Sequence, residues 1–116
     1  MKKVVISALV LLLSTAIINA QTTDFDATQS FTWLVQHSNN GNYENSLVTT
    51  AFATLALKNS GASQYADLGL DWIKQQEDPV KHCWPKGSCR TKDTAFALLV
   101  LNEFGEETSE GQEWLR

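Results

Sequence analysis

The chain has 116 residues, with 9 lysines and arginines against 13 aspartates and glutamates, a net charge of −4, and 43% hydrophobic residues. This acidic balance argues against nucleic acid and against an anionic membrane surface as partners, because both favour a clustered basic face. A chain of this length forms one small domain.

Residues 1–20 have the pattern of an export signal. Two lysines follow Met1, residues 4–18 are an almost unbroken apolar run, and Ala20 is a small residue suited to cleavage. The run is shorter than the roughly 20 residues that a membrane span needs; an uncleaved N-terminal anchor is the alternative. We therefore expect an exported protein, extracellular or at the cell surface, with residues 21–26 as a short polar lead before the domain.

Apolar periodicity predicts four helices, at about 27–37, 46–60, 63–76 and 92–104, and a fifth that begins with a capping-box-like Ser109–Gln112. The second and fourth are apolar nearly all round, which predicts buried inner helices, and the other two are amphipathic outer helices that cover them. Gly61 and Gly105 follow the inner helices, where a left-handed residue commonly ends a helix. The expected fold class is all-α.

An internal repeat organises the sequence. Residues 50–61 (TAFATLALKNSG) and 94–105 (TAFALLVLNEFG) are identical at 7 of 12 positions, with an offset of 44 residues. A period in the forties is typical of stacked helical repeats. Each copy follows a tryptophan-bearing helix and a loop that carries an aromatic residue, Tyr43 in the first copy and Trp84 in the second. Two helical hairpins are therefore expected, with the start of a third.

Cys83 and Cys89 are the only two cysteines. An even cysteine count after an export signal indicates a disulfide, and Pro85 and Gly87 between them favour a turn. A metal site would recruit His82, but no second pair of ligands has suitable spacing. We expect a disulfide and no metal or cofactor, with free thiols as the alternative.

The series Trp-Leu-x-x-Gln, a loop ending in Gly-x-aromatic, and Thr-Ala-x-Ala-x-Leu-x-Leu before Gly resembles the repeats of the squalene-cyclase and protein-prenyltransferase superfamily, the α/α toroids with terpenoid cyclase-type repeats. One degenerate glutamine–tryptophan motif comprises Trp33, Gln36, Gly41 and Tyr43, and a second comprises Trp72, Gln76 and Trp84. The resemblance covers residues 27–116. It implies an α/α toroid-like domain of two hairpin repeats plus the start of a third. Because toroids of this family close with more hairpins, the domain is expected to be either incomplete at the C-terminus or a reduced relative.

The resemblance carries over no catalytic residue. The Asp-x-Asp-Asp acid of the cyclases and the Cys-Gly-Glu-Gln thioester motif are absent from the sequence, and the Asp, Cys and His zinc ligands of the prenyltransferases have no matching set. Toroids host several activities, so the fold alone does not assign one.

The starts of the inner helices supply the candidate site residues. In toroids of this family these starts point toward a central cavity, which makes Asp93 and Thr94, and Thr49 and Thr50 in the first repeat, candidate cavity-facing residues. Asp93 is either a general acid or a first-turn carboxylate that faces the helix dipole. The candidate ligand-loop aromatics are Tyr43 and Trp84, in a binding surface formed by residues 38–46 and 77–93.

We therefore expect an exported, non-catalytic binding or interaction module whose partner is a protein or a small apolar ligand. The main alternative is the N-terminal part of a terpene cyclase or prenyltransferase-like enzyme acting on an isoprenoid-like substrate, with catalytic repeats after Arg116; a carbohydrate-active toroid ranks last. Membrane contact is expected only through an uncleaved signal or a further C-terminal anchor. Two hairpins alone leave an apolar inner-helix face open, which favours marginal stability or self-association.

Overall fold

The computed structural model describes residues 27–116, and its regular elements in that range are all helices. They are α2 (Ala27–His37), α3 (Leu47–Asn59), α4 (Ser63–Gln75), α5 (Thr91–Glu103) and α6 (Ser109–Trp114). The predicted all-α class is confirmed for this part of the chain, and the first four predicted helices agree with α2 to α5 to within one residue at each end. The predicted signal peptide and polar lead, residues 1–26, lie outside the described residues.

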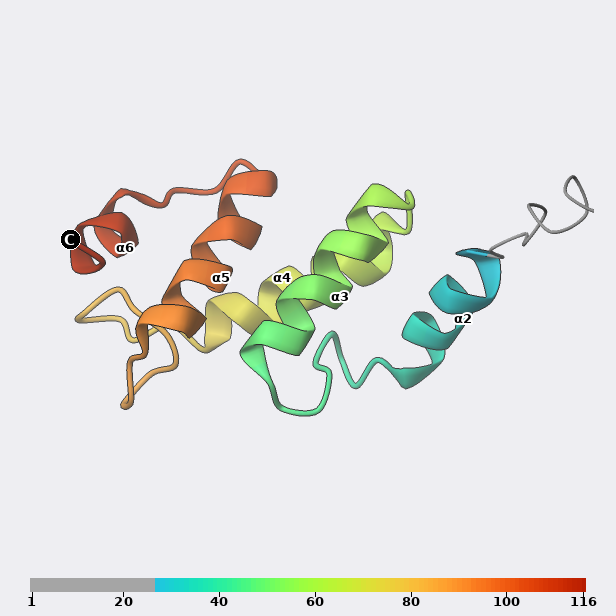
Figure 1. Ribbon diagram of the computed structural model, residues 1–116, viewed down its shortest axis with the longest axis horizontal. Coiled ribbons are helices and arrows are strands. Elements are labelled where there is room, and N and C mark those ends of the chain that lie inside the picture. Colours follow the sequence, from blue (N-terminus) through green and yellow to red (C-terminus); the bar gives the residue numbers. More distant parts are fainter. Residues whose placement is uncertain (1–26) are drawn as a thin grey trace, which may run out of the picture.

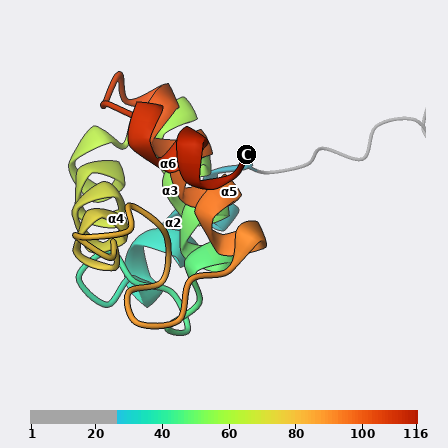
Figure 2. The ribbon, with the colours of Figure 1, turned by 90° about the vertical axis from the view of Figure 1, so that its left-hand side faces the viewer.

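The helices form two layers. Figures 1 and 2 show α3 and α5 in one layer, both running away from the same end of the molecule, and α4 in the other layer. α3 packs against both α4 and α5, α2 packs against α3, and α6 packs against α5. α4 therefore covers one side of α3 and α5, while α2 and α6 lie at the two ends of the molecule, against α3 and α5 respectively (Figure 1).

The core divides into two apolar clusters, and each contains one of the two loop aromatics. The larger cluster joins α3, α4 and α5 around Trp84 and comprises Leu47, Ala51, Leu70, Ile73, Trp84, Ala97, Leu98, Val100 and Leu101. The smaller cluster comprises Tyr43, Ala53, Leu57 and Ala66, and α2 contributes Leu34 and Val35 to its edge. The loops are thus anchored in the same clusters that hold the helices together.

Inner and outer helices meet closely at a glycine in two places. A Cβ added at Gly69 of α4 would collide with the side chain of Thr54 on α3, and one added at Gly111 of α6 would collide with Leu98 on α5. Thr54 and Leu98 are separated by the 44-residue offset of the sequence repeat. The α3–α4 and α5–α6 pairs therefore share one mode of close packing.

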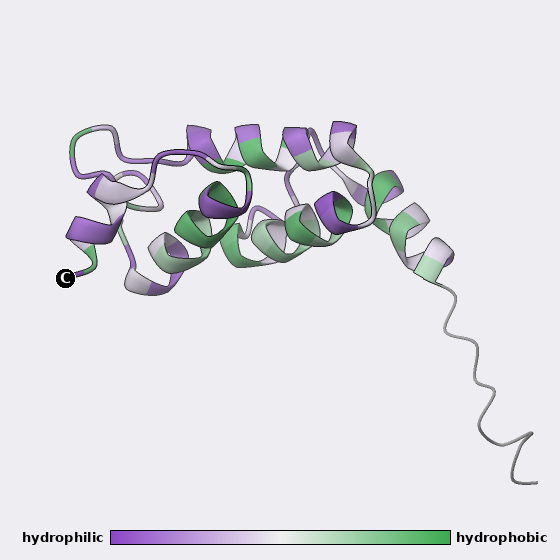
Figure 3. Cartoon of the chain, turned by 90° about the horizontal axis from the view of Figure 1, so that it is seen from above, coloured by the Kyte–Doolittle hydropathy of each residue, from purple (hydrophilic) through white to green (hydrophobic). Residues whose placement is uncertain are grey.

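The inner helices are not buried on every side as their apolar sequence predicts, and the open apolar face expected of two hairpins alone is present. Phe52 of α3 is 58% exposed and Leu99 of α5 is 44% exposed. Figure 3 shows hydrophobic colour on the side of these helices that faces away from α4. The outer layer covers only one side of α3 and α5, so part of their apolar surface stays open to solvent.

The helix ends follow the sequence in α3 and α5 and depart from it in α6. Ser46 caps α3 by accepting a hydrogen bond from the Thr49 amide at 3.2 Å, and Gly61 and Gly105 have φ angles of 83° and 73° as predicted. The predicted Ser109 cap is wrong.

Glu107 takes the place of that cap. Its carboxylate accepts hydrogen bonds from the amides of Thr108 and Ser109 at 3.0 and 2.7 Å. Hydrogen bonds from Ser109, and then from the Thr108 amide, hold the pKa of Glu107 below its usual value. An acidic residue suits this place because the amides at a helix N-terminus carry partial positive charge.

Candidate functional site

The loops before α3 and α5 lie at the same end of the molecule, where both inner helices begin (Figures 1 and 2). We call this region the loop end and define it as residues 38–46 and 77–93. The common direction of α3 and α5 places both helix N-termini there, together with their partial positive charges. The loop end is the surface that the sequence predicts for binding.

A buried threonine on each inner helix holds the loop in front of it. The amide of Tyr43 donates to Thr50 Oγ1 at 3.0 Å, and that hydroxyl donates to the Tyr43 carbonyl at 3.4 Å. The amide of Trp84 donates to Thr94 Oγ1 at 3.0 Å, and the Thr94 hydroxyl donates to the Trp84 carbonyl at 3.3 Å. These paired bonds, which we call the threonine contacts, occur in both copies of the sequence repeat.

The threonine contacts correct the expected role of Thr50 and Thr94. Both side chains are fully buried, and each hydroxyl is engaged with loop backbone rather than directed into a ligand cavity. The available sequence signal was that the same polar residue recurs in both copies of an otherwise apolar helix. A buried hydroxyl needs a hydrogen-bond partner, and the preceding loop provides it.

The two loop aromatics are structural anchors. Tyr43 is 4% exposed and Trp84 is 2% exposed, so neither ring offers a stacking surface to a ligand. The Tyr43 hydroxyl donates to the Leu34 carbonyl of α2 at 2.6 Å, and Trp84 Nε1 donates to the Ile73 carbonyl of α4 at 2.8 Å. Burial raises the pKa of Tyr43 above its usual value. Each ring ties a loop to the preceding outer helix.

A left-handed residue stands two positions before each aromatic. Gly41 has a φ of 87° and His82 has a φ of 55°. A Cβ at Gly41 would collide with the backbone of α4 at Leu68, so glycine is required there for space as well as for conformation. His82 has the same left-handed backbone conformation although it carries a side chain. The second loop therefore departs from the Gly-x-aromatic pattern of the first loop.

Between the N-termini of α3 and α5 is an open depression of about 400 Å³. Its lining residues are Ser46, Val48, Thr49, Arg90, Lys92 and Asp93. The structure thus places the two candidate residues Thr49 and Asp93 at one depression. Thr49 is exposed and its hydroxyl donates to Ser46 Oγ at 3.1 Å.

Asp93 is buried, with 6% of its surface exposed, and its carboxylate pairs with the Arg90 guanidinium. The pair sits at the first turn of α5, so the carboxylate faces both a guanidinium and the helix N-terminus. Arg90 and the helix thus compensate the charge of Asp93. Lys92, also at the depression, forms no ion pair within residues 27–116.

The second loop is closed by the predicted disulfide between Cys83 and Cys89, whose Cα atoms are 5.5 Å apart. Asp78 organises the same loop, because its Oδ1 accepts from the amides of Val80 and Lys81 at 3.1 and 3.0 Å. Its Oδ2 accepts from the Gly87 amide at 3.3 Å. The hydrogen bonds from Lys81 and then from Val80 are the main reason that the pKa of Asp78 lies below its usual value.

His82 joins this loop to α6. Its Nδ1 lies 3.0 Å from Glu77 Oε1 and 3.1 Å from Glu110 Oε2. The glutamates line a small pocket of about 110 Å³ beside Trp84 and Gly111. In the described part of the chain, no group of three or more potential ligands is arranged to hold a metal ion.

None of the helices in residues 27–116 has the length and apolarity to traverse a bilayer. Comparisons of the chain with models of protein families, with curated proteins and with solved structures find no match.

Proposed function

We propose that this chain is an exported, non-catalytic interaction module built on helical-hairpin repeats of the squalene-cyclase and prenyltransferase type. The observation that supports it most is the duplicated threonine contact, which gives both hairpins the same hydrogen-bonded junction between inner helix and loop. Stacked repeats commonly bind partners through surfaces to which successive repeats contribute equivalent elements. Here the equivalent elements are the two loops of the loop end.

The toroid-type assignment draws on further equivalences between the hairpins. Both loop aromatics donate to a carbonyl of the preceding outer helix. Both inner helices meet the following outer helix at a glycine. Such repetition of polar and close-packed contacts is expected when one supersecondary unit occurs twice, and it supports treating residues 27–116 as one repeat domain.

Binding is preferred to catalysis because of how the polar groups of the loop end are used. The hydroxyls of Thr50 and Thr94 bond to loop backbone, and the Asp93 carboxylate pairs with Arg90. These groups stabilise the inner-helix starts, where an enzyme of this type would place its acid. The proposed partner is a protein that contacts the two loops and the depression between them.

Export is supported by residues 1–20 and by the disulfide, since disulfides persist in oxidising compartments. The intact mass of protein recovered outside the cytoplasm should match a chain that begins at Gln21 and has Cys83 and Cys89 oxidised. A chain that retains Met1, or one with two free thiols, would contradict this part of the proposal.

Site-specific photo-crosslinking in the exporting cells tests the binding surface. A photoreactive residue at Lys86 or at Glu44 samples the two loops, and one at Asp67 on α4 is the matched control, because all three side chains are exposed. We expect a discrete adduct with another protein from the two loop positions and none from Asp67. Equal adducts from all three positions, or none from the loops, would overturn the proposed surface.

A further inference from the structure

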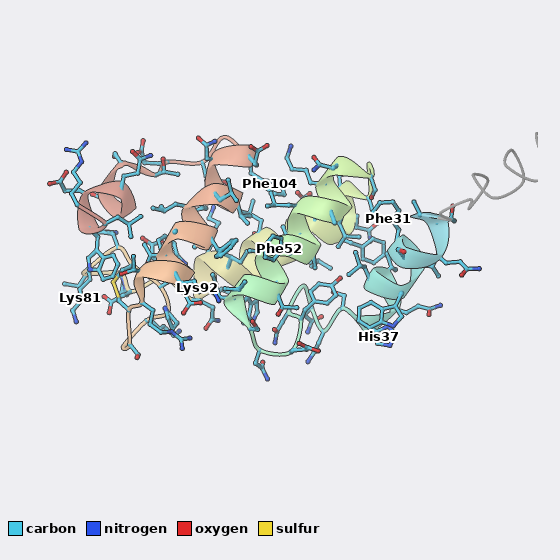
Figure 4. All side chains as sticks on the ribbon, in the orientation of Figure 1. Phe31, His37, Phe52, Lys81, Lys92 and Phe104 are labelled. Atoms are coloured by element: carbon cyan, nitrogen blue, oxygen red, sulfur yellow. A yellow bond between two sulfur atoms is a disulfide. The ribbon has the colours of Figure 1, made fainter. Side chains whose placement is uncertain are left out.

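We propose that the exposed side of the inner helices is a contact surface for a second copy of this chain, with the helices of the two copies antiparallel. We call this surface the α3–α5 face. It comprises Val48, Phe52, Leu55 and Asn59 on α3, and Lys92, Phe96, Leu99 and Glu103 on α5. Figure 4 shows Phe52 between the two helices, with Lys92 at the lower end of α5.

The internal repeat preserves the apolar centre of this face. With the 44-residue offset, Phe52 corresponds to Phe96 and Leu55 corresponds to Leu99, so the same two residue types occur in both helices. The two phenylalanine rings contact each other at a centroid distance of 5.1 Å. Phe52 and Leu99 nevertheless remain among the most exposed large apolar side chains of the described residues. A contiguous exposed apolar patch indicates a contact surface.

The charges at the two ends of α5 indicate which partner fits. Positions 92, 96, 99 and 103 follow the spacing i, i+4, i+7 and i+11, which places them on one side of the helix. Lys92 is at the N-terminal end and Glu103 at the C-terminal end. Both are exposed, and neither forms an ion pair with any residue from 27 to 116. The stripe is therefore basic at one end, apolar in the middle and acidic at the other end.

Such a stripe is complementary to itself when reversed. Suppose that α5 packs antiparallel on α5 of a second copy, with Phe96 opposite Leu99. The same register then places Lys92 of each copy opposite Glu103 of the other copy. The same two-fold axis runs α3 antiparallel to its counterpart, with Phe52 opposite Leu55. One register thus matches the apolar and the charged positions together, as an isologous interface requires.

The parallel arrangement fits less well. Packing α5 of one copy in parallel on α3 of the other would place Lys92 opposite Val48 and Glu103 opposite Asn59. Each charge would then lose water without gaining an opposite charge, which is unfavourable. The distribution of Lys92 and Glu103 therefore favours the antiparallel dimer.

This inference does not rest on the proposed function, since it concerns the sides of the inner helices and not the loops. The α3–α5 face shares Lys92 with the loop end, and its residues Val48 and Lys92 also line the depression. An adduct from Lys86 with a heterologous protein and a dimer through the α3–α5 face are separate outcomes, so either can fail alone.

Sedimentation velocity on the purified full chain over a range of concentrations tests the dimer. Lys92→Glu makes both ends of the stripe acidic, and Glu103→Lys makes both ends basic. We expect each single variant to raise the dimer Kd about tenfold or more, because like charges then face each other. The double variant, and an equimolar mixture of the two single variants, should recover wild-type affinity.

The side chains of Lys92 and Glu103 are exposed. Far-UV circular dichroism unchanged from the wild type would show that the variants fold. Phe52→Glu should also dissociate the dimer, whereas Leu68→Glu on the outer helix α4 is the matched exposed control and should not. A monomer at every concentration would overturn the inference. Association that is unaffected by the single charge reversals would also overturn it. Contact between copies through the apolar residues 4–18 would give that result.

Discussion

Replacement of Thr94 by valine is expected to lower the free energy of unfolding by about 1–3 kcal/mol, the cost of a buried donor without a partner. The variant keeps the shape of the side chain and removes the hydroxyl that accepts from the Trp84 amide at 3.0 Å. The Trp84 carbonyl keeps a second hydrogen bond, from the Arg90 amide at 2.7 Å. The loss in free energy of unfolding therefore comes from the Trp84 amide, which is left buried without a hydrogen-bond partner.

The repeat provides the controls. Thr50→Val should cost a similar amount, because it orphans the Tyr43 amide while the Tyr43 carbonyl keeps the Ser46 amide at 3.0 Å. Thr49→Val changes an exposed neighbour and should stay within about 0.5 kcal/mol of the wild type. Thr94→Ser retains the hydroxyl and should recover most of the loss.

Urea unfolding monitored by tryptophan fluorescence measures these differences, with the buried Trp84 as a reporter. In a domain of this size, 1 kcal/mol corresponds to about 4–8 °C in Tm, so thermal unfolding provides a second readout. A cost of Thr94→Val no larger than that of Thr49→Val would show that the threonine contact does not stabilise the fold. A loss for Thr94→Ser as large as that for Thr94→Val would show that packing, and not the hydroxyl, is responsible.

Three further effects on unfolding follow. Gly41→Ala should cost about 2–4 kcal/mol, because the added Cβ meets α4 backbone in a left-handed turn, whereas Gly61→Ala, which has open space, should cost about 1. Reducing the Cys83–Cys89 disulfide should lower stability by about 2 kcal/mol at neutral pH, measured by thermal unfolding with and without reductant. Because its pKa is lowered in the folded state, Asp78 stabilises the fold above its ordinary pKa of about 3.9, and this contribution is lost as the pH falls through the folded value. Asp78→Asn should thus lose less stability than the wild type between pH 6 and pH 3, and an identical loss would contradict the assignment.

The helix boundaries could be predicted because they depend on local chemistry. Apolar spacing marks the helices, and glycine marks their ends because it adopts positive φ at little cost. The Cys83–Cys89 pairing was equally predictable, because the chain has only two cysteines and they are separated by a short loop that favours a turn. These features require no knowledge of which helix packs on which.

The roles of buried polar and aromatic side chains could not be predicted in the same way. Thr94 and Trp84 are ten residues apart, and only the folded hairpin shows that the hydroxyl faces the loop backbone. The Trp84 indole is amphipathic, so the sequence permits either an exposed stacking ring or a buried anchor; the Ile73 carbonyl makes burial favourable. The repeat count likewise predicted an open apolar inner-helix face, but only the packed helices show that Phe52 lies on it.

Each inner helix is expected to hold its loop rigidly through a buried threonine, so that the loop end is pre-arranged for contact. Amide hydrogen exchange measured by NMR tests it most directly at Tyr43 and Trp84, whose amides donate to Thr50 and Thr94. We expect both amides to be protected to a similar degree, well above the rate of an unstructured peptide of the same sequence. Exchange of both amides at the unstructured rate would contradict the claim.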